Sequence, residues 1–163
     1  MMQHPGIRKK QILIPLFLIL PFFSIGKDEK KGYEGYVELG GHGGLGSLNL
    51  QKAFLSKNSL QINWSLGFSL APIDPNNGVA LVFPIMIQSQ YGRSQNKIEL
   101  GAGQGISIST KGAFFARATA ALGYRRYSAS GKRYFKIAYT PLISYLVDFQ
   151  WQHWAGIGIG FKL

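Results

Sequence analysis

Residues 60–70 read LQINWSLGFSL, and this stretch decides the fold. Its even-numbered residues, from Leu60 to Leu70, are all apolar, whereas its odd-numbered residues, from Gln61 to Ser69, are polar or glycine. A period of two is the repeat of a β-strand, in which successive side chains point to opposite faces. A strand with one apolar and one polar face fits two settings. One is a soluble sandwich with a buried inner face, and the other is a barrel with lipid outside and a polar lumen.

The same alternation recurs along the rest of the chain, in residues 37–39, 47–54, 98–109, 114–125, 135–147 and 157–163. Residues 79–91 are less regular, because Val82, Pro84 and Met86 are apolar on the face that we expect to point inward. Gln104 is a polar residue on a face that we expect to point outward.

Turn-forming residues separate these segments at 56–58, 74–78, 92–96, 111–112, 128–132 and 149–153. The first segment, 33–55, is about twice as long as a usual membrane strand. It contains a glycine-rich run at 40–44, Gly-Gly-His-Gly-Gly, which can turn. Splitting the segment there predicts an all-β fold, an antiparallel up-and-down transmembrane barrel of eight strands.

The N-terminus has the layout of a secretory signal peptide. The basic run Arg8-Lys9-Lys10 precedes an apolar run at 12–25, and small residues precede a cleavage point after Gly26. The apolar run, ~14 residues, is shorter than the ~20 that a spanning helix needs. We therefore expect a signal peptide at 1–26, a short charged segment at 27–32 and a β-barrel domain at 33–163.

The composition excludes several classes of protein. The 163 residues have room for one domain, and 46% hydrophobic residues with 15% charged residues are not typical of a disordered chain. A disulfide scaffold is excluded because the chain has no Cys. The net charge of +11 is compatible with binding to nucleic acid, with binding to anionic lipid or simply with high solubility. Because an exported chain meets lipid, we expect outer-membrane lipids and no nucleic acid as partners.

An even number of strands leaves both chain ends in the periplasm. The turns near 56–58, 92–96 and 128–132 then lie on the periplasmic side, with the basic residues Lys57, Arg93, Lys97, Lys132 and Arg133. Tyrosines near the same rim are expected to form an aromatic girdle: Tyr33, Tyr36, Tyr91, Tyr124, Tyr127 and Tyr134. Trp151 and Trp154 lie near the opposite rim.

The last strand is similar to the C-terminal signal that the barrel assembly machinery reads in outer-membrane barrels. Its apolar positions are Ile157, Ile159, Phe161 and Leu163, and Leu163 stands where such signals usually end in Phe. This resemblance implies that machinery as a partner.

Residues 33–163 as a whole resemble the small eight-stranded outer-membrane barrels of the OmpA/OmpX-like class. The matching motifs are Glu38–Gly41, Ser47–Asn49, Glu99–Gly103, Gly123–Arg125 and Thr140–Ile143. The resemblance implies a fold and an outer-membrane location but no activity.

The best constellation of charged residues is expected inside the barrel, where the alternation places Glu38, Glu99, Arg117, Arg125 and Lys136. An eight-stranded barrel is just wide enough for side chains to fill it. Since an unpaired buried charge is costly, we expect these residues to form a salt-bridge plug. A narrow ion path or a gate is the alternative.

Signals for catalysis are weak. The spacing Gly41-x-Gly43-x-x-Gly46 matches the glycine motif of dinucleotide-binding proteins. That motif has to open a helix, and no helical pattern follows it here. A lipid-modifying enzyme needs a nucleophile, a His and a carboxylate near the outer rim, and Ser144, His153 and Asp148 are the only group of this kind. Two histidines near that rim, His42 and His153, are too few for a metal site. We therefore expect no catalytic, cofactor-binding or metal-binding residues and no cofactor.

The predicted extracellular connections are short, which argues against a receptor with a large partner. We predict a monomeric, non-enzymatic integral outer-membrane protein with a structural or minor transport role. The alternatives are a lipid-modifying enzyme acting at the outer rim and a secreted soluble β-barrel binding protein.

Overall fold

The computed structural model of the protein describes residues 32–74, 78–145 and 149–163. The predicted signal peptide, 1–26, lies outside the described residues, as does nearly all of the charged segment 27–32. No helix in the described ranges is long and apolar enough to cross a membrane.

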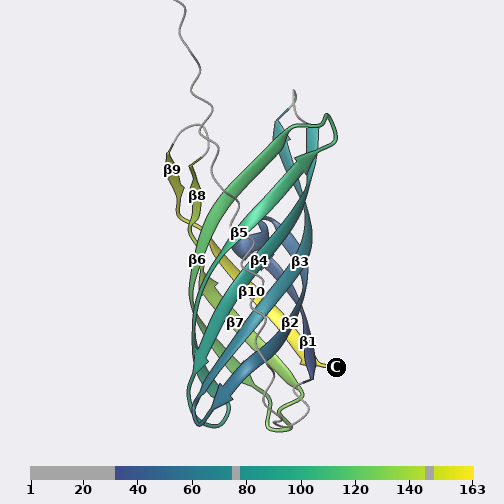
Figure 1. Cartoon of the computed structure of the whole chain (residues 1–163). Helices are drawn as coiled ribbons and strands as arrows, with labels where there is room; N and C mark the ends of the chain where they lie inside the picture. Colours follow the sequence, from purple (N-terminus) through teal and green to yellow (C-terminus); the bar gives the residue numbers. More distant parts are fainter. Residues whose placement is uncertain (1–31, 75–77, 146–148) are drawn as a thin grey trace, which may run out of the picture.

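Ten strand segments form one closed antiparallel barrel whose wall is eight strands wide (Figure 1). The segments are β1 (Tyr33–Gly40), β2 (Gly46–Lys57), β3 (Leu60–Asp74), β4 (Gly78–Tyr91), β5 (Asn96–Ser109), β6 (Phe114–Tyr127), β7 (Arg133–Tyr139), β8 (Leu142–Ser144), β9 (Gln150–Gln152) and β10 (Ala155–Lys162). Both β7 and β8 pair with β6, so β8 continues the line of β7. In the same way β9 pairs with β8 and β10 pairs with β7. The predicted eight-stranded barrel is thereby confirmed, although β9 occupies part of the stretch 149–153 that the sequence predicted as a turn.

The last strand closes the barrel on the first. β10 pairs with β1 in a register that sets Ile159 opposite Val37, and the Leu163 amide donates to the Tyr33 carbonyl at 2.8 Å. Ile157, Ile159, Phe161 and Leu163 all point outward and are 47–68% exposed. Tyr33 and Leu163 mark what we call the terminal rim, and the opposite end of the barrel is the distal rim.

The two faces of the wall have opposite polarity. In β3 the even-numbered Leu66, Phe68 and Leu70 are 41–53% exposed on the outside, whereas Asn63 and Ser65 are at most 1% exposed inside. A soluble barrel buries its apolar residues in its interior, and a wall of exposed Leu, Ile and Phe on all sides is unstable in water. The inverted arrangement is that of a barrel in lipid.

Local irregularities in the pattern have identifiable causes. Val82, Pro84 and Met86 do point inward and are buried, and the β3–β4 ladder has no pair between Leu66–Ile85 and Ser69–Val82. Proline supplies no amide donor, which accounts for an interruption beside Pro84. Gln104 lies on the outer wall and donates to the Tyr145 hydroxyl at 2.5 Å, so this polar residue has a partner there.

Glycines on β10 make room for large side chains of β7. Gly158 lies opposite Lys136 and Gly160 opposite Tyr134. A Cβ atom on Gly158 would lie 3.0 Å from the Lys136 Cγ atom, and one on Gly160 would overlap the Tyr134 ring. The alternation of glycine with apolar residues in the C-terminal segment is therefore a packing requirement of the lumen.

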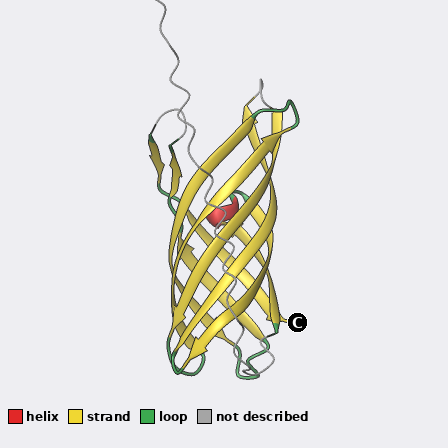
Figure 2. Cartoon of the chain, viewed as in Figure 1, coloured by secondary structure: helices red, strands yellow, loops and turns green. Residues whose placement is uncertain are grey.

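The β1–β2 connection turns into the barrel. It contains the short 3₁₀ helix η1 (Gly41–Gly43), which Figure 2 shows in red inside the wall. Gly40 and Gly41 have φ of 70° and 76°, which residues with a Cβ atom rarely adopt. The sequence correctly predicted a turn here, but the expectation that His42 lies near the outer rim is wrong, because His42 is 3% exposed in the lumen.

This turn leaves the wall incomplete toward the distal rim. The last β2–β3 pair is Ser47–Ser69, and residues 70–74 of β3 pair only with β4. Within the described part of the chain, β9 pairs only with β8. We call the interval between these two unpaired strand edges the distal notch.

The predicted tyrosine girdle is half correct. Tyr33, Tyr91 and Tyr124 are 41–65% exposed on the outer wall near the terminal rim. Three tyrosines point into the lumen instead and form a buried cluster: Tyr36, Tyr127 and Tyr134. Their strand parity, which they share with Glu38, Arg125 and Lys136, is the physical reason, since residues two apart on a strand lie on one face.

Candidate functional site: a lumen closed by ion pairs

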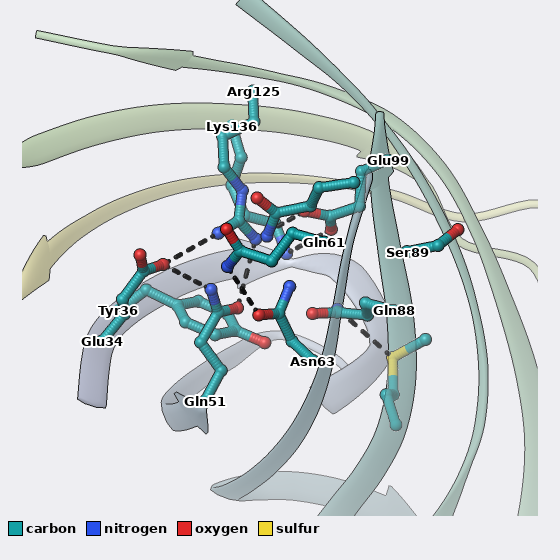
Figure 3. A network of polar contacts seen from close by, with 12 residues as sticks. Glu34, Tyr36, Gln51, Gln61, Asn63, Gln88, Ser89, Glu99, Arg125 and Lys136 are labelled. Atoms are coloured by element: carbon teal, nitrogen blue, oxygen red, sulfur yellow. Dashed lines mark hydrogen bonds and ion pairs between the residues drawn. The ribbon is translucent and has the colours of Figure 1, made fainter. Parts of the chain in front are cut away.

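Five charged residues from four strands converge inside the barrel. Figure 3 shows Glu34 from β1, Glu99 from β5, Arg125 from β6 and Lys136 from β7 among polar side chains of β2, β3 and β4. Glu38 of β1 completes the set. Arg125 and Glu38 are both 0% exposed, so these charges depend on one another for compensation.

The first part of the ion-pair chain joins η1 to β7. The Nδ1 atom of His42 lies 2.9 Å from Oε2 of Glu38, and the other Glu38 oxygen lies 3.0 Å from the Lys136 ammonium. Lys136 also lies 3.5 Å from Oε1 of Glu99. The turn is thus connected to the far wall through one carboxylate and one ammonium group.

The second part of the chain runs toward the terminal rim. One Arg125 nitrogen lies 2.5 Å from Oε2 of Glu99, and another lies 3.3 Å from Oε2 of Glu34. Gln51 bridges this pair, because its amide donates to Glu34 at 2.5 Å and its carbonyl accepts from Arg125 at 3.2 Å. Negative and positive groups therefore alternate from Glu38 through Lys136, Glu99 and Arg125 to Glu34.

An aromatic ring lies close to each of the two buried cations, Lys136 and Arg125. The Lys136 ammonium lies 4.5 Å from the centroid of the Tyr36 ring, and the Arg125 guanidinium carbon lies 4.2 Å from that of Tyr134. The Tyr127 and Tyr134 rings lie 5.2 Å apart. A cation over an aromatic face is stabilised, most strongly where it is desolvated, so the buried tyrosines strengthen the chain.

Among the described residues, those at the centre of the ion-pair chain have no solvent-accessible surface. Arg125, Gln51, Gln88, Gln90 and Asn63 are all 0% exposed, so a water molecule does not reach them. The side chains fill the lumen at this level, as an eight-stranded barrel allows.

Four of the five charges that the sequence placed in one network are joined by these ion pairs: Glu38, Glu99, Arg125 and Lys136. Arg117 lies apart. It shares the inward face of β6 with Arg125, but eight residues of strand separate the two by about 26 Å along the strand. Arg117 is exposed above η1 and has no ion pair with a described acidic residue.

Sequence reasoning missed Glu34 and His42. Glu34 has the same strand parity as Glu38, and this signal could have identified it. His42 could not be placed by parity, because the left-handed glycines before it take the chain off the strand.

The sequence suggested Ser144, His153 and Asp148 as a possible catalytic group. The two of these residues that the structure describes, Ser144 and His153, point to opposite faces of the wall. Ser144 lines a small internal cavity with Arg117 and Gln150. The Nδ1 atom of His153 lies 2.6 Å from the exposed Tyr139 hydroxyl. Asp148 lies outside the described residues. Within the described ranges no three His, Cys, Asp or Glu residues gather to hold a metal ion.

Comparison with known proteins gives a likeness of fold. No protein-family model matches the chain, and no curated protein matches it. The N-terminal β-barrel domain of Pseudomonas aeruginosa OprF is 13% identical, with a TM-score of 0.53 over 80% of this chain and 95% of that one. OmpTdeltaL8, a loop deletion mutant of an outer membrane protein of Vibrio cholerae, is 14% identical, with a TM-score of 0.39 over 72% of this chain and 38% of that one. The likeness to OprF shows that the chain has the fold of the small eight-stranded outer-membrane barrels.

Proposed function

We propose that the protein is a non-enzymatic integral barrel of the outer membrane whose lumen is permanently closed, with a structural role. The observation that carries this proposal is the ion-pair chain from His42 to Glu34, whose central members exclude water. A permeant ion would have to separate buried groups that compensate one another, and removing one partner of a buried pair is strongly destabilising. A continuous ion path is therefore disfavoured.

The location is supported by the polarity of the wall. Apolar side chains cover the outside of the long strands, whereas polar and charged side chains fill the inside toward the terminal rim. The signal-peptide layout of residues 1–26 supports export. We further propose that the protein is a monomer, and that the assembly machinery reads the outward-facing C-terminal residues Ile157, Ile159, Phe161 and Leu163.

The absence of a catalytic role is supported by the placement of the suspected group. Ser144 points inward and His153 outward, so a proton cannot pass directly between the two side chains. In the described residues neither side chain has a carboxylate partner that would orient it.

Conductance in planar lipid bilayers tests the closed lumen. We expect no stepwise conductance from the refolded wild-type protein or from Arg126→Gln, which changes an exposed arginine on the outer wall. Arg125→Ala removes a large, fully buried side chain at the centre of the lumen and should produce openings. Steady single-channel conductance from the wild-type protein would overturn the proposal in favour of a transport role.

A further inference from the structure

A cavity of about 60 Å³ lies above η1, on the distal side of the ion-pair chain. His42, Gly43 and Gly44 form its floor, and its walls include Ala80, Val82, Phe115 and Leu142. We call this space the vestibule. Apart from Ser107 and Arg117, its walls are apolar, in contrast with the polar lumen below. Ala80 and Val82 stand on the face of β4 that carries Gln88 and Gln90 nearer the terminal rim.

The vestibule has one polar side. Arg117 and Leu142 also line a smaller adjoining cavity of about 30 Å³, whose other lining residues are Ser144, Gln150 and Gln152. These polar side chains come from β6, β8 and β9, whereas most of the apolar wall comes from Ala71 and Pro72 of β3 and from the two β4 residues named above. Arg117 therefore stands between an apolar space and a polar one and has no ion-pair partner among the described acidic residues.

The distal notch lies at the same height. Leu70 of β3, which is one residue beyond the last β2–β3 pair, is 53% exposed on the outer wall. Leu81, the partner of Leu70 on β4, is 39% exposed, and Phe114 on β6 is 60% exposed. The outer wall is thus still apolar where the β2 side of the wall ends, so the notch opens into the lipid-facing belt.

We propose that the vestibule binds a single-chain anionic amphiphile that enters from the bilayer through the distal notch. Arg117 pairs with the anionic headgroup, and Ser144, Gln150 and Gln152 offer further hydrogen bonds. The first carbons of the amphiphile's hydrocarbon chain contact Val82, Phe115 and Leu142. A volume of about 60 Å³ holds only a few water-sized groups. The rest of the amphiphile's hydrocarbon chain therefore passes out through the distal notch, where it lies along the apolar edge of β3.

An uncharged long-chain compound and a short anion can each make only one of the two kinds of contact that this site offers. A long-chain alcohol brings the apolar contacts without the charge, and acetate brings the charge without the chain. A fatty acid and a lysophospholipid with a terminal phosphate both combine the two, and their relative affinity distinguishes a carboxylate from a phosphate headgroup.

Equilibrium binding to the full-length protein in nanodiscs of zwitterionic lipid tests this proposal, with palmitate, palmitoyl lysophosphatidate, hexadecanol and acetate as probes. We expect saturable binding of one palmitate or one lysophosphatidate, and at least about tenfold weaker binding of hexadecanol and acetate. Arg117→Gln should weaken palmitate binding by about tenfold and leave hexadecanol binding unchanged. Arg126→Gln, on the outer face of the same strand, should change neither.

Fluorescence provides a second measurement that needs no variant of the site. The Trp154 indole nitrogen donates to the Gly44 carbonyl at 3.3 Å, beside the vestibule floor. Palmitate brominated near its carboxylate should therefore quench Trp154 in a Trp64→Phe, Trp151→Phe background. Equal binding of palmitate and hexadecanol, or equal palmitate binding by wild-type and Arg117→Gln protein, would overturn the proposal. This result is independent of conductance, so the closed lumen and the amphiphile site can fail separately.

Discussion

The Nδ1 atom of His42 lies 2.9 Å from the Glu38 carboxylate, although Glu38 belongs to a wall strand and His42 to a turn inside the barrel. Gly40 and Gly41, both with positive φ, reverse the chain between the two residues. A Cβ atom on Gly41 would overlap the Glu38 carboxylate. The turn that floors the vestibule is therefore held by the same carboxylate that begins the ion-pair chain.

Loss of the His42 side chain should destabilise the barrel. His42→Ala leaves Lys136 as the ion-pair partner of Glu38 among the described residues, and it removes the contact with the Tyr36 hydroxyl, which lies 3.3 Å away. We expect a loss of about 1–3 kcal/mol in the free energy of unfolding, measured by urea titration of the refolded protein. His153→Ala is the control, since its partner Tyr139 is exposed, and should cost less than about 1 kcal/mol. Equal losses would show that His42 does not anchor the turn.

Glu99 should be coupled to Lys136. The Glu99 carboxylate contacts both buried cations, so Glu99→Gln should cost about 3–5 kcal/mol by leaving them undercompensated. Lys136→Met also takes the ammonium group away from Glu38, so the double variant should lose less stability than the sum of the two single losses. A double-mutant cycle from urea titrations measures the coupling. Strict additivity of the two changes would contradict a shared network.

A methyl group on Gly160 should be harmful, because the Cβ atom would occupy the position of the Tyr134 ring. Gly160→Ala should therefore lower the free energy of unfolding by about 1–3 kcal/mol, the usual cost of overpacking. Gly46→Ala is the matched control in a strand. Its Cβ atom would meet no heavy atom closer than 3.6 Å, and its effect should stay within about 0.5 kcal/mol. A harmless Gly160→Ala would contradict the glycine–tyrosine packing across β10 and β7.

The orientation of the barrel can be read from cysteine labelling of intact cells, since the chain has no native Cys. Lys111→Cys lies in the β5–β6 turn at the distal rim, and Ala129→Cys lies in the β6–β7 turn at the terminal rim. With the chain ends in the periplasm, a membrane-impermeant maleimide should label position 111 and not position 129. The opposite labelling would invert the orientation, and the distal notch would then face the inner leaflet.

Deletion of 159–163 should abolish insertion in the outer membrane. These residues carry most of the β10 register with β1, and without them the barrel has an open edge. Unpaired backbone groups are not tolerated in lipid, so the truncated protein should accumulate in the periplasm and be degraded. Leu163→Phe is the control, and its assembly should equal or exceed that of the wild type. A truncated protein that still shows heat-modifiable mobility in the outer-membrane fraction would show that β10 is not needed for closure.

The wall and most of its lumen charges could be predicted from the sequence. The alternation in 60–70 and its repeats predicted the strands, and strand parity placed Glu38, Glu99, Arg125 and Lys136 inside. Parity alone also accounts for Glu34 and for the inward Tyr36, Tyr127 and Tyr134, which a simple count of rim positions assigned to the girdle. Where a residue lies on a regular strand, its face follows from its number, since the strand repeat is two.

The height of a residue in the lumen followed only from the tertiary structure. Arg117 and Arg125 share a face, yet their separation along β6 puts one beside the vestibule and the other in the ion-pair chain. The inward course of η1, the position of His42 and the distal notch were likewise decided by the folded chain. Alternation is a local property of one strand. Which charges meet depends on the register and stagger between strands, and on backbone reversals at glycines that carry no side-chain pattern.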